Sequence, residues 1–535
     1  MSDATLAPIG LIVVPIIAAA LSLAAGLVRA RSGWMVALAA LLVEAVLMIW
    51  LVDSVYRGSG RLVHELGAYG RPGPDGFAVG IELVADELSV LVVVLISVVS
   101  LGVLAISRRG GPRGNAFYSA YLLLAGGLMG VSLTGDLFNM FVFLEIVGLA
   151  TYTLVAADRS AESAVAALKY LLIGTTGASL FLVGVGYLFL ATGTLNMADL
   201  AAMLAGEPSF VEGALYGDTL VIAGFGFITA GLLVKSAIFP LHTWQPDAYS
   251  AAADSVTVYI SALASTVAAY AFARVMLTVF TPAFFEVNTI AATAIVTLAS
   301  ISIVAGSALA VMQRRVKRML AYSSVSQFGL IIAAIGIAVH PAAVDAGIPF
   351  AGIERTAAEF AVIGTAIHLV GHGLIKGGLF AAVGTIARTE GARTVAEYAE
   401  LGRRAPVRSG AMAVLALALV GVPPTVGFLG KWYIALGAVG AGLWPLAVVI
   451  FASTVLTLAY VARLLERLYF TPRSVAVPER VAADGGTAAT VEPISPTAGA
   501  VVVLVLAAIG AVALGFVGAE VTEALDPFIA EVFNS

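Results

Sequence analysis

A single carboxylate lies in the middle of an apolar run of about twenty residues. The run reads GDLFNMFVFLEIVGLATYTLVAAD, from Gly135 to Asp158, and the carboxylate is Glu145. Counted from Asp136, Glu145 lies about 14 Å along a helix, and half of a bilayer's hydrocarbon core is about 15 Å thick. If the run spans a membrane, Glu145 lies near the midplane. Because a carboxylate cannot extend far toward the headgroups, this position favours a functional role.

Three lysines, Lys235, Lys376 and Lys431, also lie in apolar runs. Each charge near the bilayer centre costs about 2.5–3.5 kcal/mol, so these lysines and Glu145 would together cost roughly 12 kcal/mol if unpaired. We therefore expect them to be paired, hydrated or both. Two of the lysines have structural alternatives. Lys235 lies seventeen residues after Asp218 and could extend to the cytoplasmic interface, and Lys431 follows two prolines that could place it near a turn.

Two histidines and a lysine are spaced for one face of a helix. His368, His372 and Lys376 occur at i, i+4 and i+8 in AIHLVGHGLIKGG, which makes a stripe about 12 Å long. Because histidine changes protonation near neutral pH, the stripe suits proton transfer. Packing histidines and a metal or haem site are the alternatives. No acidic or thiol ligand lies nearby in the sequence, and we expect neither a metal nor a cofactor.

The composition predicts an all-α polytopic membrane protein. Of 535 residues, 60% are hydrophobic and 11% are charged, whereas soluble proteins carry about 25% charged residues. The chain has no Cys, which excludes disulfides and cysteine-ligated iron–sulfur clusters, and its net charge of -5 gives no indication of nucleic-acid binding. Runs long enough to cross a lipid bilayer recur along the chain. We expect about fourteen spans, near 6–28, 34–54, 84–106, 116–134, 137–156, 164–190, 219–239, 253–277, 288–311, 321–339, 357–387, 409–435, 442–465 and 497–518.

Two of these spans are interrupted by prolines. LVKSAIFPLHTWQPDAY contains Pro240 and Pro246, and LVGVPPTVGFLGKW contains Pro423 and Pro424. Each break removes a backbone donor, which a membrane tolerates where protein or a wet cavity supplies a new partner. The breaks lie five spans apart, each beside a lysine. Five is odd, so the two repeats would be inverted, and broken helices at matching places point to the ion path of a transporter.

The basic residues predict the orientation of the chain. Alternate loops are rich in arginine and lysine, and the positive-inside rule assigns these loops to the cytoplasm and both termini to the outside. The residues of the basic loops are Arg29, Arg31, Arg108, Arg109, Arg113, Arg159, Arg314, Arg315, Lys317, Arg318, Arg388, Arg393, Arg403, Arg404, Arg408, Arg463, Arg467 and Arg473.

Seven motifs over roughly residues 80–470 give the chain a family resemblance. They are GDLFNMFVFLEI, ALKYLLIG, ATGTLNMADLA, LVKSAIFPLHTWQPDAYSAA, KRMLAYSSVSQFGL, HLVGHGLIKGGLF and GVPPTVGFLGKW, in this order. Together they resemble the D-type subunit of the Mrp cation/proton antiporters, which is related to the proton-channel subunits of respiratory complex I and membrane-bound hydrogenases. The resemblance implies two inverted five-helix units, each with a broken helix. The implied divisions are 1–115 for flanking helices and an outer hairpin, 116–277 and 288–470 for the two units, and 471–535 for a cytoplasmic loop and a last helix.

The resemblance also implies roles for individual residues. Glu145 matches the glutamate of the fifth helix, Lys235 its partner on the broken seventh, and Lys431 the lysine of the broken twelfth. The histidine stripe with Lys376 matches the polar residues of the eleventh helix. The secondary candidates in or near these motifs are Asp136, His242, Thr266 and Lys317.

One position departs from the family pattern. Thr266 stands in STVAAYA where the D-type pattern has a lysine, and the preceding proline pair is replaced by Asp254 and Ser255. A hydroxyl can hold a water molecule but cannot carry the charge, so the resemblance leaves two possibilities for the central relay. Either water bridges the two halves, or the pathway runs elsewhere.

The function implied is that of a membrane subunit in a multi-subunit Na⁺(K⁺)/H⁺ antiporter of the plasma membrane. Its partners would be other hydrophobic subunits, and its cargo protons with Na⁺ or K⁺. It would not itself be an enzyme. The alternative is a proton-pumping subunit of a complex I-like oxidoreductase or membrane-bound hydrogenase, in which cysteine-containing partners would carry the electrons. A solitary carrier or channel fits the broken helices but not the histidine stripe.

Overall fold

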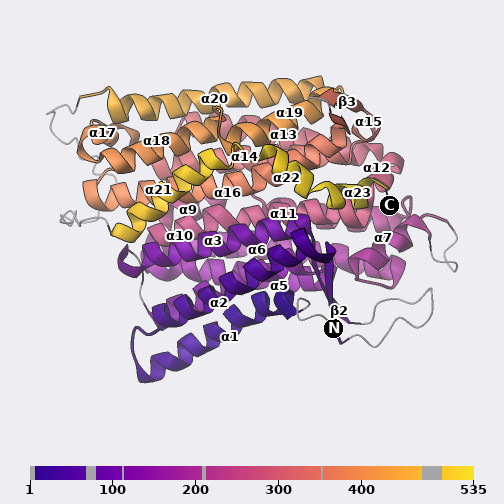
Figure 1. Cartoon of the computed structure of the whole chain (residues 1–535), viewed down its shortest axis with the longest axis horizontal. Coiled ribbons are helices and arrows are strands. Elements are labelled where there is room, and N and C mark those ends of the chain that lie inside the picture. The colour runs from indigo at the N-terminus through magenta and orange to yellow at the C-terminus, as the bar shows by residue number, and fades with distance from the viewer. Residues whose placement is uncertain are drawn as a thin grey trace.

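The helices lie roughly alongside one another in a stack, with the N-terminal half of the chain toward one end and the C-terminal half toward the other (Figure 1). The computed structural model describes residues 6–67, 80–110, 112, 114–207, 213–350, 353–472 and 497–534. The N-terminal helices form one end of the stack and α20 (Trp444–Tyr469) the other, while the last three helices cross in front (Figure 1). The first helix begins and the last helix ends on the right-hand side of Figure 1, so both chain ends lie on one side of the stack.

Three helices and a hairpin precede the first unit. The helices are α1 (Ala7–Val28), α2 (Gly33–Asp53) and α3 (Glu87–Gly110), with the short η2 (Ser54–Ser59) continuing α2. Strand β1 (Leu62–Leu66) pairs antiparallel with β2 (Ile81–Ala85). The sequence predicts a span from residue 84, whereas α3 begins three residues later because residues 84 and 85 hydrogen-bond within the hairpin.

The first unit contains one long central span and one broken span. Its helices begin at polar caps: Asp136 caps α5, Ser160 caps α6 and Asp218 caps α8. The elements are α4 (Asn115–Leu133), α5 (Leu137–Val155), η3 (Ala156–Asp158), α6 (Ala161–Thr192), α7 (Met197–Ala205), α8 (Thr219–Lys235), α9 (Gln245–Ala251), α10 (Asp254–Tyr259), η4 (Ile260–Ala264), α11 (Ser265–Val275), η5 (Met276–Phe280) and α12 (Thr281–Val287).

The second unit is followed by three helices that pack back over the stack. Helix α21 contacts both α16 and α3, and so joins the second unit to the flanking helices. The elements are α13 (Thr289–Val311), α14 (Val316–Ala338), α15 (Pro341–Val344), β3 (Gly347–Phe350), β4 (Ile353–Thr356), α16 (Ala357–Glu390), η6 (Val395–Tyr398), α17 (Leu401–Arg404), α18 (Pro406–Val420), α19 (Val426–Gly440), α20, α21 (Ala498–Ala513), α22 (Gly518–Ala524) and α23 (Asp526–Asn534).

The described residues contain 11 helices that are long and apolar enough to cross a bilayer, or 12 when α21 and α22, bent by 78°, are taken as one span. The other two predicted spans are the interrupted ones, which consist of the shorter apolar helices α8, α18 and α19. The predicted class, an all-α polytopic membrane fold, is confirmed. The unit boundaries stay predictions, and the loop predicted after residue 471 lies mostly outside the described residues.

Burial is greatest in the middle of the stack. The span from Asp254 to Val287 is wholly buried in its most apolar window, and α14 is nearly so, whereas α1 and α2 expose most of theirs. An exposed apolar surface suits contact with lipid or with other membrane subunits. The central helices are therefore the ones shielded from lipid, and they are where polar side chains can be held.

Candidate functional site

Lys235 lies at the break in α8. It is the last residue of that helix, and the chain then turns through Ala237, which has φ 55°, before α9 begins at Gln245. The Trp244 indole donates a hydrogen bond of 3.1 Å to the Val234 carbonyl, which also accepts from the Ala237 N–H at 3.1 Å in the turn that ends the helix. The Lys235 ammonium is thus held at a helix C-terminus, where the partial negative charge favours a cation.

The structure brings Glu145 and Lys235 together across 90 residues of sequence. The Lys235 Nζ atom lies 3.0 Å from Glu145 Oε1 and 3.5 Å from the Leu144 carbonyl. The lysine side chain is 8% exposed and the glutamate 23% exposed. Lys235 therefore turns toward Glu145 instead of extending to the interface, and each group offsets the other's desolvation.

A small-residue surface leaves room for this pair. A Cβ atom at Gly148 would lie 3.2 Å from Lys235 Nζ and 2.9 Å from the Tyr152 hydroxyl, and one at Gly174 would meet the same hydroxyl. The Tyr152 hydroxyl is buried and has no hydrogen-bond partner among the described residues. The absence of a side chain at Gly148 lets α5 lie close to the ammonium, and its absence at Gly174 lets α6 lie close to Tyr152.

We expect Gly148→Val to reduce proton transport on the order of tenfold, because the added side chain pushes Lys235 or Tyr152 from its position. Gly226→Val is the matched control, since a Cβ atom at that position of α8 meets nothing within 4 Å. The measurement is the rate of proton transport in vesicles, normalised to subunit level. Equal rates in the two variants would show that the space beside Lys235 is unimportant.

Lys376 lies on α16 and is fully buried. Its ammonium donates to the Leu320 carbonyl at 2.8 Å and to the Ser323 hydroxyl, both on α14. Within the described ranges no carboxylate lies within salt-bridge distance of it. Lys376 thus has neutral oxygen partners where Lys235 has an anion.

The two histidines precede Lys376 on the same face of α16. The His368 Nε2 atom lies 3.0 Å from Gln327 Oε1 on α14. Both ring nitrogens of His372 are buried without a partner in the described part of the chain, and its ring packs edge-on against Phe328 at 4.6 Å. No group of three or more His, Asp or Glu residues within that part could hold a metal. Proton transfer and packing are both compatible with these contacts.

Lys431 lies beside the second break. Helix α18 ends at Val420, Gly421 adopts φ 93°, and α19 resumes at Val426 after the two prolines. The Lys431 ammonium donates to the Leu419 and Val420 carbonyls at 3.1 and 2.9 Å, which the break has freed. Lys431 is therefore well inside α19 and not in the turn.

Thr266 lies on the central span between these lysines. Helix α11 packs against α8, α14 and α16. The Gln245 side-chain amide donates to Ser265 Oγ and to the Tyr249 hydroxyl at 3.1 Å each. The Thr266 hydroxyl is buried and has no partner among the described residues. A buried hydroxyl without a protein partner costs about 1–3 kcal/mol unless water supplies one, so a water molecule beside Thr266 would be favourable.

The remaining secondary candidates have structural contacts. Asp136 caps α5 by accepting from the Asn139 N–H at 2.8 Å. His242 is buried, and its ring lies over Phe239. Lys317 pairs with Asp254 at 2.8 Å, so the aspartate that replaces a family proline now anchors the start of α14. None of these contacts of the three candidates is to Lys235, Lys376 or Lys431.

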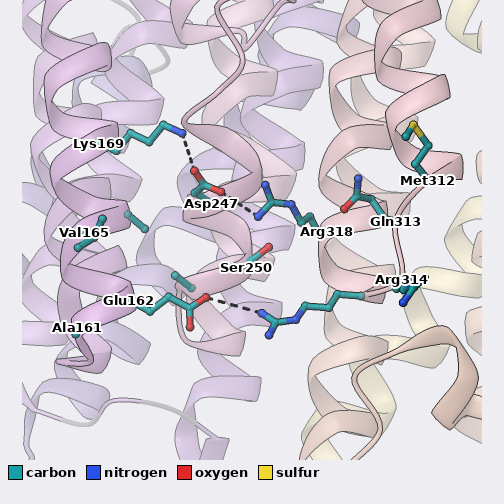
Figure 2. Close-up of a pocket in the computed structure, with 13 residues that line it drawn as sticks. Ala161, Glu162, Val165, Lys169, Asp247, Ser250, Met312, Gln313, Arg314 and Arg318 are labelled. Carbon is teal, nitrogen blue, oxygen red and sulfur yellow. Dashed lines mark hydrogen bonds and ion pairs between the residues drawn. The ribbon is translucent and has the colours of Figure 1, made fainter. Parts of the chain in front are cut away.

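A cavity of about 700 Å³ opens beside α9, between α6 and α14. In Figure 2, Asp247 lies between Lys169 and Arg318, at 2.6 and 3.1 Å. A third contact joins Glu162 to Arg315 at 4.0 Å. The cavity thus provides a charged surface at α9, the helix that follows the break after Lys235.

The sequence predictions missed several polar groups of this region. Lys169 and Asp247 are charged residues within two of the recognised motifs, and this position in a motif was the signal that could have identified them. Gln327 and Ser323 also lie within a recognised motif, KRMLAYSSVSQFGL, but they are neutral, and no spacing marks them. Glu44 had the same signal as Glu145, since it lies alone in an apolar run.

Known proteins resemble this chain in sequence and in fold. The chain is 38% identical over 443 residues to NADH-quinone oxidoreductase subunit N of Desulforudis audaxviator, covering 82% of each chain. It is 31% identical over 389 residues to the D-type Na(+)/H(+) antiporter subunit of Bacillus subtilis, covering 72% of each. The structure of the Mrp complex from Dietzia sp. contains a chain that superposes with a TM-score of 0.83 at 24% identity, covering 100% of this chain and 98% of that one, which shows a shared fold.

Residues 134–457, which include both breaks and all four buried charges discussed above, match the family described as NADH:quinone oxidoreductase/Mrp antiporter, TM. The chain belongs to this family of membrane subunits.

Proposed function

We propose that this chain conducts protons across the bilayer as one membrane subunit of a multi-subunit complex. The observation that carries the proposal is the Glu145–Lys235 contact of 3.0 Å at the break of α8. The proton path would use this pair, then His368, His372 and Lys376, and finally Lys431.

The partners of the lysines support a transfer from one to the next. Beside Glu145, Lys235 is stabilised in its protonated form, and when the two groups separate it holds its proton less tightly. Lys376 and Lys431 contact only carbonyl and hydroxyl oxygens within the described residues, which carry no full charge. Such partners accept a hydrogen bond from a lysine without fixing its charge, so the lysine can both gain and lose a proton.

Two kinds of complex fit this proposal. The motif ATGTLNMADLA and the 31% identity to a D-type antiporter subunit favour a Na⁺(K⁺)/H⁺ antiporter. The 38% identity to a subunit N favours a redox-driven proton pump, and it gives this second candidate the greater weight. With no Cys in the chain, iron–sulfur clusters would lie in partner subunits.

Purification from the native membrane in mild detergent separates the two candidates. A redox-driven complex would bring iron–sulfur and flavin proteins with the tagged chain, and electron donors would drive proton uptake in everted vesicles. An antiporter would bring small hydrophobic subunits, and added Na⁺ or K⁺ would dissipate a preformed pH gradient. A complex that moves no protons under either condition would contradict the proposal.

A further inference from the structure

Glu44 is a buried carboxylate outside the proposed pathway. It lies on α2, about 16 Å from Gly33 when counted along the helix, and so near mid-membrane. Although α2 is among the most exposed spans, Glu44 is 0% exposed. It therefore points into the protein, toward the helices that α2 packs on, which are α1, α3 and α4.

The described residues provide no cation to offset the charge of Glu44. Both carboxylate oxygens are buried and have no hydrogen-bond partner among these residues. Helices α1 and α4 have no charged residue. The charged residues of α3 are Glu87 in its first turn and two arginines in its last turns, far along the helix from its middle. An ionised carboxylate in such a place is unfavourable, and a neutral carboxylic acid is the form that the surroundings accept.

Hydroxyl groups gather where Glu44 points. The side chains of Tyr121 and Tyr259 lie within electrostatic reach of its carboxyl group. Tyr259 shares a hydrogen bond of 3.0 Å with Ser100, and Tyr121 donates to the Ser100 carbonyl. The two tyrosine rings stack at 4.6 Å. This hydroxyl cluster, Ser100, Tyr121 and Tyr259, joins α3 and α4 to the central span.

The hydroxyl cluster also adjoins the helix of Lys376. Tyr259 ends α10, and the next segment, η4, packs on α16. Ala262 of η4 meets α16 at two glycines, because a Cβ atom at Gly373 would lie 2.9 Å from its carbonyl and one at Gly377 would lie 3.3 Å from its methyl. Gly377 is the residue after Lys376, so the segment that follows Tyr259 packs on α16 one residue away from Lys376.

We propose that Glu44 is a proton-binding site, occupied at neutral pH, on a hydroxyl-lined branch that connects the flanking helices to the proton path at α16. The proposal rests on the proton conduction proposed above. The branch would also let protons reach α16 without passing Thr266, the position at which the chain lacks the lysine of the D-type pattern. Because the Ser100 and Tyr121 hydroxyl groups are engaged by other partners, a proton fits Glu44 better than a metal cation, which needs several free oxygens.

Infrared difference spectroscopy of the purified complex tests the protonation. At neutral pH, Glu44→Gln should remove a carbonyl-stretch band of a protonated carboxylic acid, and Na⁺ should not change that band. The matched control is Glu145→Gln, which should remove carboxylate bands instead. Loss of a carboxylate band in Glu44→Gln, or loss of the acid band on adding Na⁺, would overturn the proposal.

Transport in proteoliposomes tests the connection. Glu44→Gln keeps the size of the side chain, and we expect transport to fall on the order of tenfold with normal assembly. Glu44→Asp should keep part of the rate, and Tyr259→Phe should lower it. Tyr398→Phe is the control, since it removes a different buried hydroxyl, which has no hydrogen-bond partner in the described part of the chain. If the spectra assign a protonated-acid band to Glu44 but the Glu44→Gln complex transports protons at the parental rate, the branch is overturned. Failure of the unmodified complex to move protons would instead contradict the proposed function itself.

Discussion

Lys235→Arg is expected to stop proton transport by the assembled complex even though the positive charge is kept. A guanidinium can still pair with Glu145, which lies 3.0 Å from the present ammonium, so folding and assembly should be preserved. Arginine does not release its proton in proteins. The ion pair could then no longer release a proton, and the rate of proton transport should fall by at least about a hundredfold. The measurement is proton movement in everted vesicles at matched subunit levels.

Glu145 provides the companion variants for this experiment. Glu145→Gln leaves Lys235 buried without an anion, which should stop transport and cost up to about 3–5 kcal/mol of stability. Glu145→Asp keeps the charge and shortens its reach, so part of the activity should remain. Robust transport in Lys235→Arg would show that the pair is structural and that the proton travels elsewhere.

Lys431→Ala is expected to abolish transport while leaving assembly intact. The ammonium lies beside the break between α18 and α19 and donates to the Leu419 and Val420 carbonyls. Without it, the second unit loses the lysine that could accept and release a proton at this break. The loss in vesicle transport should be as large as that of Lys235→Arg.

Lys431→Arg separates the charge of this residue from its proton exchange. It can still donate to the two carbonyls, so it should assemble normally and still fail to transport. Parental transport rates in Lys431→Ala, with normal subunit levels, would remove this residue from the pathway.

The sequence by itself determined the spans and the positions of the charges within them. Apolar length, the i, i+4, i+8 spacing from His368 to Lys376 and the prolines at both breaks are local properties, and each acts within one helix. These were enough to predict an all-α membrane fold with two interrupted spans, and the structure has both. They also identified Lys235 and Lys431 as neighbours of the breaks.

Only the tertiary structure decided what each charge contacts. Lys235 meets Glu145 across 90 residues, whereas Lys376 meets carbonyl and hydroxyl groups of α14 and no carboxylate among the described residues. The same packing buries Glu44 without a hydrogen-bond partner among the described residues, although its sequence signal equals that of Glu145. The physical reason is that the surroundings of an ionisable side chain in an apolar helix are supplied by other helices, and which helices it faces depends on how the whole stack packs.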